Sequence, residues 1–238
     1  MAMTLTAMIL AAGRGARMRP LTDHTPKPLL EVGGHTLIER MINSLVSAGI
    51  TRLVINHAWL GEQIVARLGD GARLGAQITW SPENPALETA GGLAHALDHL
   101  GERFIAVNAD ILCDYPFERL LARGQSIEPN IDAHLVMVDN PPQHPTGDFT
   151  LANGTRLTFA GIGLYRARLL AGIEPGQPAP LAPLLRAAMA REAITGEHYH
   201  GRWSDIGTPE RLTAADRACA GAPGLPHNGS SSIGLLRQ

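Results

Sequence analysis

Apolar runs of strand length alternate, along the first half of the chain, with longer segments whose apolar residues recur at helical spacing. Strands are expected at 7–10, 53–55, 78–80 and 104–107, and helices at 36–48, 61–68 and 90–100. Such alternation is typical of parallel strands joined by crossover helices. It predicts an α/β fold, namely a mostly parallel, twisted, Rossmann-like sheet with helices on both faces. Ligands of such sheets bind beyond the carboxyl ends of the strands.

The pattern changes at residue 133. The apolar run 133–138 is followed by FTLANGTRLTF, in which two strand-like segments flank Asn153-Gly154, a dipeptide typical of tight hairpin turns. We expect a small antiparallel lobe over about residues 133–165, inserted in a single domain that spans residues 1–220.

Helix signals return towards the C-terminus. Residues 182–190 show helical spacing, and Thr208 followed by Pro209 predicts a helix start, because threonine caps helices and proline suits their first position. Residues 221–238 are mostly small and polar and are rich in glycine and proline, so we expect a disordered tail there.

Composition narrows the classes of partner. The chain has 238 residues, of which 45% are hydrophobic and 18% charged, and its formal net charge is -2. This composition is ordinary for a globular protein and has no basic excess for binding nucleic acid. The cysteines, Cys113 and Cys219, lack metal-ligand spacing, and no apolar run is long enough to span a membrane. We expect a cytoplasmic protein that binds neither nucleic acid nor membranes.

The segment LAAGRGARMRPLTDHTPKPLLEVGG, residues 10–34, combines flexible backbone with positive charge directly after the first predicted strand. Gly13 and Gly15 allow a ligand to approach main-chain amides closely, and such amides bind anions. The Gly-Lys-Ser/Thr of a Walker loop is absent, and Met18 stands where a dinucleotide-binding loop has its third glycine. The segment therefore predicts a phosphate-binding loop of another kind.

Lysine usage singles out one position in this loop. Of the twenty basic residues, nineteen are arginine and only Lys27 is lysine. Lysine carries a compact, mobile point charge, whereas arginine presents a rigid planar fork. Either this single lysine is a matter of chance in a chain that favours arginine, or the position of Lys27 requires a compact charge that arginine cannot provide.

Taken together, these segments resemble the signature of the sugar-1-phosphate nucleotidyltransferases. The glycine-rich loop and its Pro-Lys pair are followed by VINHAWLGEQI, SPENPALETAGG, VNADI, HLVMVDNP, TFAGIG, LAPLLRAAM and GEHYHGRWSDIGTPERL, so the resemblance covers residues 7 to about 217. It implies the nucleotide-diphospho-sugar transferase fold and a reaction between a sugar 1-phosphate and a nucleoside triphosphate. Among members, the chain is most similar to uridylyltransferases that act on N-acetylmuramate α-1-phosphate. That similarity implies UTP as the nucleotide and a place in peptidoglycan recycling.

The resemblance also implies roles for particular residues. The nucleotide phosphates are expected at Ala11, Ala12, Gly13, Arg14 and Gly15, and the base at Glu83, Thr89, Gly91 and Gly92, with Glu88 as an alternative to Glu83. The expected catalytic cations are Arg17 and Lys27, and the expected sugar contacts are Asn108, Gly147, Asp148 and Gly161. Arg14 and Arg19 are equally consistent with solvated surface charges.

Two aspartates are candidate magnesium ligands. Asp110 follows the apolar strand FIAVNA at its carboxyl end, and Asp205 lies shortly before the last predicted helix. Magnesium prefers oxygen ligands and is often held by one or two carboxylates together with substrate phosphates. In the family that the chain resembles, the corresponding pair holds the metal, so Mg²⁺ is the expected cofactor. No general base is expected, because a phosphate is largely dianionic at neutral pH.

Two other functions stay open from the sequence. A mannose-1-phosphate guanylyltransferase, or another sugar-1-phosphate enzyme, would apply the same chemistry to other substrates. A non-catalytic nucleotide-sugar sensor would keep the fold without the reaction, but the presence of Arg17, Lys27, Asp110 and Asp205 together disfavours it. The sequence does not indicate the oligomeric state.

Overall fold

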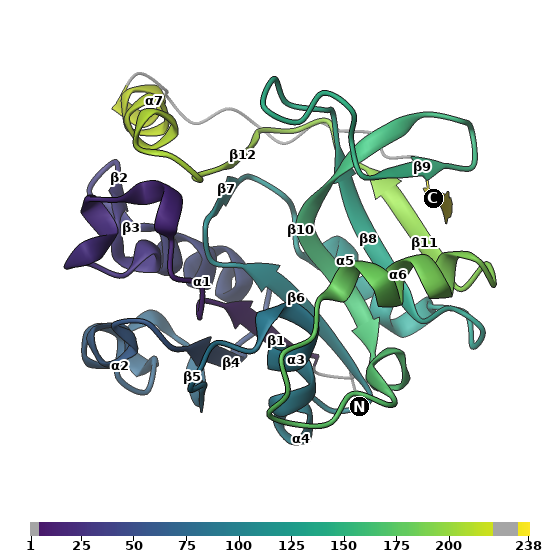
Figure 1. Ribbon diagram of the computed structural model, residues 1–238, viewed down its shortest axis with the longest axis horizontal. Coiled ribbons are helices and arrows are strands. Elements are labelled where there is room, and N and C mark those ends of the chain that lie inside the picture. The colour runs from purple at the N-terminus through teal and green to yellow at the C-terminus, as the bar shows by residue number, and fades with distance from the viewer. Residues whose placement is uncertain (1–4, 221–232) are drawn as a thin grey trace.

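The computed structural model describes residues 5–220 and 233–238, and a nine-stranded sheet forms its centre (Figure 1). The strands lie in the order β5, β4, β1, β6, β10, β8, β11, β13, β9. Their bounds are β1 (Thr6–Leu10), β4 (Arg52–His57), β5 (Gln77–Pro82), β6 (Arg103–Asn108), β8 (Ala133–Val138), β9 (Phe149–Leu151), β10 (Arg156–Arg166), β11 (Ile194–His198) and β13 (Ile233–Arg237). Two short ladders, β2 (Glu31–Val32) with β3 (His35–Thr36) and β7 (Ile111–Cys113) with β12 (Trp203–Asp205), lie outside this sheet.

Half of the sheet has the predicted parallel pairing. Strands β5, β4, β1 and β6 run parallel to one another. From β6 onward the sheet is mixed, because β10 runs antiparallel to both β6 and β8, whereas β8 and β11 run parallel. The α/β class is therefore confirmed, but the prediction of a mostly parallel sheet is too simple.

The predicted antiparallel lobe is continuous with this main sheet. The hairpin at Asn153-Gly154 exists, but β9 pairs only with the first two residues of β10, Arg156 and Leu157. The remainder of β10 is almost entirely buried and lies between β6 and β8. A strand that is buried on both faces belongs in the interior of a sheet, and the hairpin signal could not show how far β10 extends.

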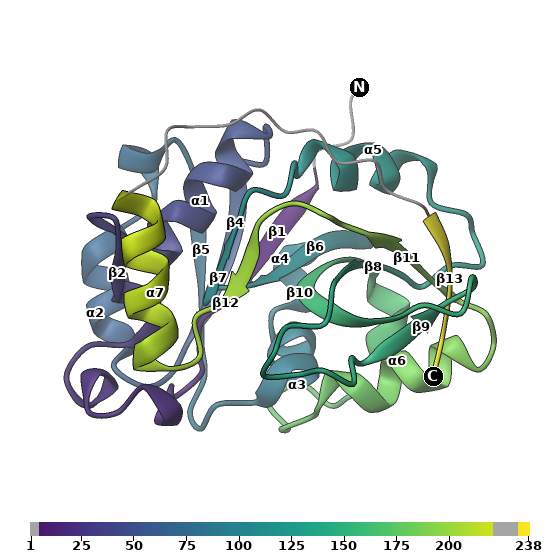
Figure 2. The same cartoon turned by 90° about the horizontal axis from the view of Figure 1, so that it is seen from above.

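Helices cover both faces of the sheet (Figure 2). They are α1 (Leu37–Ser47), α2 (Gly61–Leu68), α3 (Glu88–His95), α4 (Leu97–Leu100), α5 (Glu118–Ser126) and α6 (Leu181–Met189). Helix α7 (Pro209–Ala220) packs instead against β2 in a separate small apolar cluster. One apolar cluster joins α1, α2 and α5 to the sheet, and a second joins α3, α4 and α6 to its other face. Among the described residues, no helix is long and apolar enough to cross a membrane.

The first strand shows why the sheet needs cover on both sides. Ala7 and Ile9 of β1 pack into the cluster that contains α1, whereas Met8 packs into the cluster that contains α3. All three side chains are fully buried. A parallel strand of this kind reads as a continuous apolar run, which is the pattern in the sequence.

Thr36 caps α1, and the cap is linked to a group of ion pairs around the buried Glu39 carboxylate. The Glu39 amide donates to the Thr36 hydroxyl oxygen at 3.3 Å, and that hydroxyl donates to the Glu39 carboxylate at 2.9 Å. Arg67 and Arg73 also donate to this carboxylate. Burial by itself raises the pKa of Glu39, but the hydrogen bonds from Arg67, Arg73 and Thr36 outweigh it and lower the pKa to about 2. The ionised form therefore stabilises the folded state.

Replacing Glu39 by glutamine should lower the free energy of unfolding at pH 7 by about 2 kcal/mol. This value is smaller than the pKa shift alone would give, because solvent screens the largely exposed guanidinium groups of Arg67 and Arg73. The folded-state pKa is depressed, so the stabilisation is present above the ordinary pKa of about 4.5 and is lost as the pH falls through about 2. Urea unfolding between pH 7 and pH 3 measures this loss. Glu62→Gln, an exposed change on α2, is the control; a Glu39→Gln effect that does not change with pH would contradict the assignment.

The last helix, the helix at 90–100 and the C-terminal tail agree with the predictions only in part. The Arg211 amide donates to the Thr208 hydroxyl oxygen at 3.4 Å, so α7 has the predicted cap. The helix predicted at 90–100 is interrupted at Ala96, between α3 and α4. The tail also differs from the prediction, because Ile233–Arg237 forms β13 between β11 and β9; residues 221–232 lie outside the described residues.

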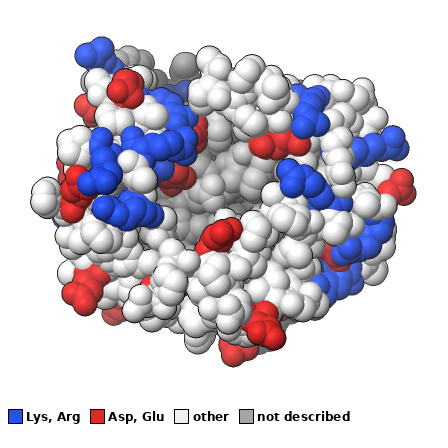
Figure 3. Space-filling view, in the orientation of Figure 1, with Lys and Arg blue, Asp and Glu red and all other residues white. Residues whose placement is uncertain are grey.

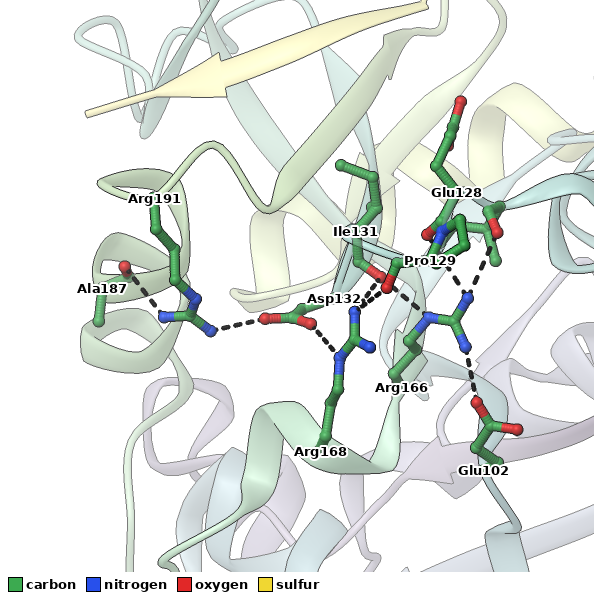
Figure 4. Close-up of polar contacts among 10 residues, drawn as sticks. Glu102, Glu128, Pro129, Ile131, Asp132, Arg166, Arg168, Ala187 and Arg191 are labelled. Atoms are coloured by element: carbon green, nitrogen blue, oxygen red, sulfur yellow. Dashed lines mark hydrogen bonds and ion pairs between the residues drawn. The ribbon is translucent and has the colours of Figure 1, made fainter.

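An arginine cluster joins β8 and β10 at the end where β8 begins (Figure 4). Asp132, directly before β8, accepts hydrogen bonds from Arg168 at 2.5 Å and from Arg191 at 2.6 Å. Arg166, the last residue of β10, pairs with Glu102 at 2.6 Å. These contacts fix the strands at the end away from the pockets described next.

Candidate active site

Two adjoining pockets, with volumes of about 360 and 520 Å³, share Arg17, Asn108 and Asp110 in their walls. We call them the first and the second pocket. The first also includes residues 10–13, 15–18, 27 and 28, together with Asn56, Glu83, Ala86, Glu88, Thr89, Ala109 and Gly207. The structure thus brings the glycine-rich segment to the carboxyl ends of β1, β4 and β6, as expected for a sheet of this class. A hollow opens on this face, and basic side chains gather over its left rim (Figure 3).

The backbone of the glycine-rich loop is prepared for an anion. Gly15 has a φ of 66°, and a Cβ atom there would lie 3.1 Å from both the Lys27 Cβ and the Thr22 Cγ2, so the position requires glycine. The Thr22 hydroxyl donates to the Gly15 carbonyl at 2.8 Å and fixes the turn. Within the described residues, the amides of residues 12–16 have no hydrogen-bond acceptor. They are therefore available to phosphate oxygens.

The two expected catalytic cations, Lys27 and Arg17, both line the first pocket, but they differ in burial and in ion pairing. The Lys27 side chain is only 12% exposed and forms an ion pair with Asp110. Arg17 is exposed and lines both pockets, and no carboxylate within residues 5–220 and 233–238 pairs with it. Lys27 therefore supplies a positive charge at a fixed position. The exposed Arg17 side chain can move towards a ligand bound in either pocket.

A short ladder brings the two candidate metal ligands together. Strands β7 and β12 pair antiparallel, with Asp205 opposite Ile111, and the Ile206 amide donates to the Asp110 carbonyl at 2.8 Å. Both carboxylates line the second pocket, and they are 29% and 28% exposed. Residues far apart in the sequence thus form one acidic pair.

The acidic pair is balanced by cations. Asp110 pairs with Lys27, and Asp205 accepts hydrogen bonds from Arg211 at 2.5 Å and from Gln143 at 2.9 Å. Two partly exposed carboxylates beside a pocket offer the oxygen donors that Mg²⁺ requires. The donor set of the pair therefore fits the expected metal.

The opposite end of the first pocket contains a buried amide and carboxylate. Asn56 accepts a hydrogen bond from the Ala11 amide at 2.7 Å and donates to Glu83 at 2.6 Å. Glu83 also accepts from the Leu87 amide at 2.8 Å. The sequence reasoning missed Asn56, although its place at the end of a strand beside β1 matches that of Asn108. Asn56 links the phosphate loop to the segment that contains Thr89.

Arg14 does not point into the first pocket. Its guanidinium carbon lies 3.5 Å from the centre of the Trp59 ring, and its side chain donates to the Thr22 carbonyl at 3.0 Å. It also lies 3.5 Å from Asp23. In this structure Arg14 holds the loop against Trp59, and its phosphate contact stays a prediction. Arg19 pairs with Asp23 on the surface.

Gly91 and Gly92 lie in α3 and pack closely against neighbouring residues, outside the lining of the first pocket. A Cβ atom on Gly91 would lie 2.4 Å from the Gln177 carbonyl oxygen, and one on Gly92 would lie 2.5 Å from a Glu83 carboxylate oxygen. The Gly91 amide already donates to the Ala179 carbonyl. Gly92 therefore leaves room for the Glu83 carboxylate beside the first pocket, and Gly91 leaves room for the chain at 177–179.

Two of the four predicted sugar contacts line the second pocket, and the other two lie behind its wall. Asn108 and Gly161 line the second pocket, and Gly161 has a φ of 71°, so that a Cβ atom there would lie 2.5 Å from the Asn108 amide nitrogen. Asp148 instead accepts from the Phe159 amide at 2.8 Å and contacts His144 at 3.0 Å, and it acts through these two wall residues. Gly147, with a φ of 61°, allows the turn before Asp148.

Sequence reasoning also missed part of the wall of the second pocket. Gln143, His144 and Arg211 line it, and two of them bond to Asp205. Neither a motif nor a strand end marks Gln143 or His144 in the sequence. Arg211 lies in the first turn of α7, where the cap at Thr208 gave the only local signal.

Comparisons with known proteins agree with this geometry. The family model described as nucleotidyl transferase matches residues 6–153. The chain is 50% identical, over 92% of its length and 99% of the relative, to N-acetylmuramate alpha-1-phosphate uridylyltransferase of Neisseria meningitidis serogroup B. It is 30% identical to the mannose-1-phosphate guanylyltransferase catalytic subunit beta of Dictyostelium discoideum, over 87% of the chain and 62% of that protein. Its fold is similar to that of HddC from Yersinia pseudotuberculosis, with a TM-score of 0.74, 17% identity and coverage of 90% and 99%.

Proposed function

Because the chain belongs to the nucleotidyl transferase family, we propose that it joins UTP to N-acetylmuramate α-1-phosphate and releases pyrophosphate. It is a sugar-1-phosphate nucleotidyltransferase, and the uridylyltransferase activity rests on the relative that is 50% identical over nearly its whole length. The relative that acts on mannose 1-phosphate is more distant. We place the reaction in the cytoplasm, as a step of peptidoglycan recycling.

The reaction brings two anions together. An oxygen of the sugar phosphate attacks the α-phosphorus of UTP, and the bond from that phosphorus to the oxygen bridging to the β-phosphate breaks. Two unit charges about 4 Å apart repel by roughly 4 kcal/mol at an effective dielectric constant near 20. The site must therefore neutralise charge and align the reacting atoms, and it needs no base to activate the phosphate.

The cations and amides of the first pocket match this requirement. The amides of residues 12–16 and the Arg17 guanidinium, to which the described part of the chain gives no acceptor or carboxylate, would bind the β- and γ-phosphates. Lys27, fixed beside Asp110, would lie at the α-phosphate and the incoming sugar phosphate, where the two pockets meet. Asn56, Glu83 and Thr89 would contact the uridine at the far end of the first pocket.

Asp110 and Asp205 would hold Mg²⁺ through their carboxylates. When bound, the metal would stabilise the negative charge of the α-phosphate and of the attacking phosphate. The ion pairs with Lys27 and Arg211 hold both carboxylates in place beside the second pocket.

The second pocket suits an anionic sugar. N-acetylmuramate 1-phosphate carries a lactyl carboxylate besides its phosphate, whereas mannose 1-phosphate has no such group. Arg17 and Arg211 place two guanidinium groups in its wall, beside the carboxylates of Asp110 and Asp205 that would bind the metal. A carboxylate there would gain charge-assisted hydrogen bonds, which favours the muramate substrate.

A substrate panel tests the proposed function directly. Pyrophosphate release should require Mg²⁺ and should be highest with UTP and N-acetylmuramate α-1-phosphate. Turnover of GTP with mannose 1-phosphate in place of this pair would establish the guanylyltransferase alternative. Measurable nucleotide-sugar binding without pyrophosphate release from any pair would identify a sensor.

A further inference from the structure

Strands β8 and β11 end side by side, and three side chains with metal-binding groups lie just there. The parallel pairing places His198 opposite Met137, and the Tyr199 amide donates to the Met137 carbonyl at 2.7 Å, which continues the ladder past β11. Side chains alternate along extended chains, so Asp139 and His200, each two residues further on, face the same side as His198. The backbone thus presents a His-x-His pair beside a carboxylate from the neighbouring strand.

The three side chains are in contact. His198 Nε2 lies 2.9 Å from Asp139 Oδ1, and the ring centres of His198 and His200 are 3.8 Å apart. One ligand atom from each residue lies within 4.8 Å of the other two. Asp139 and His200 are exposed, so the cluster is open to solvent on one side. Three protein donors with one open side are the arrangement of a zinc site that keeps a position for water or another ligand.

We propose that Asp139, His198 and His200 bind a transition-metal ion, for which Zn²⁺ fits best, at a site separate from the Asp110 and Asp205 pair. Two imidazoles and one carboxylate suit Zn²⁺ and Co²⁺, whereas Mg²⁺ prefers oxygen ligands alone. Carboxylates without histidines form the other site, so the two sites select different metals.

The position of this site gives it a consequence for the second pocket. Asp139 is the first residue after β8 and begins the segment 139–148, which carries Gln143 and His144 into the pocket wall. A metal bound to Asp139 would tie the start of this segment to the end of β11. The ion would therefore fix the pocket wall, and its three ligands lie outside the lining of both pockets.

Cobalt absorption tests the site without relying on activity. The full chain, without any affinity tag, is titrated with Co²⁺ in the presence of excess Mg²⁺. We expect one equivalent to produce the intense visible bands of four-coordinate Co²⁺, and Zn²⁺ to abolish them. His200→Ala and Asp139→Asn, both on exposed side chains, should weaken Co²⁺ binding by at least the roughly 10- to 100-fold that loss of a supporting group causes at metal sites.

Matched variants separate this site from other ligands. His95→Ala removes an exposed histidine of α3 and should leave the bands unchanged, and so should the Asp110→Asn, Asp205→Asn double variant. Far-ultraviolet circular dichroism checks that each variant is folded. Absence of the bands in the wild type, or equal Co²⁺ affinity in the His200→Ala variant, would overturn the proposal.

Discussion

Asp110→Asn and Asp205→Asn should each lower kcat by about 100- to 1,000-fold, the cost of removing one group that stabilises charge in the transition state. Both carboxylates line the second pocket, and asparagine keeps their size while it removes the charge that attracts a divalent cation. The concentration of Mg²⁺ needed for half-maximal rate should also rise. Steady-state pyrophosphate release as a function of Mg²⁺ concentration measures both effects.

Asp98→Asn is the matched control, because Asp98 is an exposed aspartate of α4 outside both pockets. It should leave kcat and the Mg²⁺ requirement unchanged. If Asp205→Asn retained wild-type kcat and an unchanged Mg²⁺ requirement, the metal assignment would be wrong.

Lys27→Arg should lower kcat by about 100-fold or more, nearly as much as Lys27→Ala, although it conserves the charge. The Lys27 side chain is 12% exposed, pairs with Asp110 and passes close to Gly15, so the site has little room for a planar guanidinium. Arg19→Lys makes the reverse exchange at an exposed position and should have little effect. Recovery of full activity in Lys27→Arg would contradict a requirement for a compact charge.

The single lysine also permits a chemical version of this test. An amine-selective reagent can modify only Lys27 and the N-terminal amine in this chain. Inactivation should follow modification of Lys27, and bound UTP with Mg²⁺ should slow it. Mass spectrometry locates the modified residue, and activity that persists after complete modification of Lys27 would refute its role.

The pattern of apolar residues within a segment predicted those helices and strands that the segment forms by itself. The helix at 61–68 and the strand at 133–138 have the predicted bounds, because their apolar periodicity is complete within each segment. The extent of β10 and the existence of β13 depend on pairing with distant strands. Neither Gly154 nor the polar tail could indicate that Ile162 lies beside β6 or that Leu235 lies opposite Thr195.

The same distinction, between features of one segment and features that depend on distant residues, holds for the candidate site. The glycine-rich loop and Asn108 could be placed from the sequence, because each lies at or just after the end of a predicted strand. Lys27 was marked by being the single lysine of the chain. Arg14 could not, since its position depends on Trp59, which comes from another strand-to-helix connection. The partners of Asp205 are likewise tertiary, because Gln143 and Arg211 reach it from different elements.

The metal clamp between Asp110 and Asp205 is the central claim, and an anomalous scattering experiment tests it most directly. Crystals grown with Mn²⁺ and a non-hydrolysable UTP analogue locate the ion independently of any assumption about catalysis. We predict an anomalous peak in contact with both carboxylates and with the α-phosphate, and the analogue in the first pocket beside Lys27. Absence of a peak at this pair of carboxylates, or an analogue bound away from Lys27, would contradict the account.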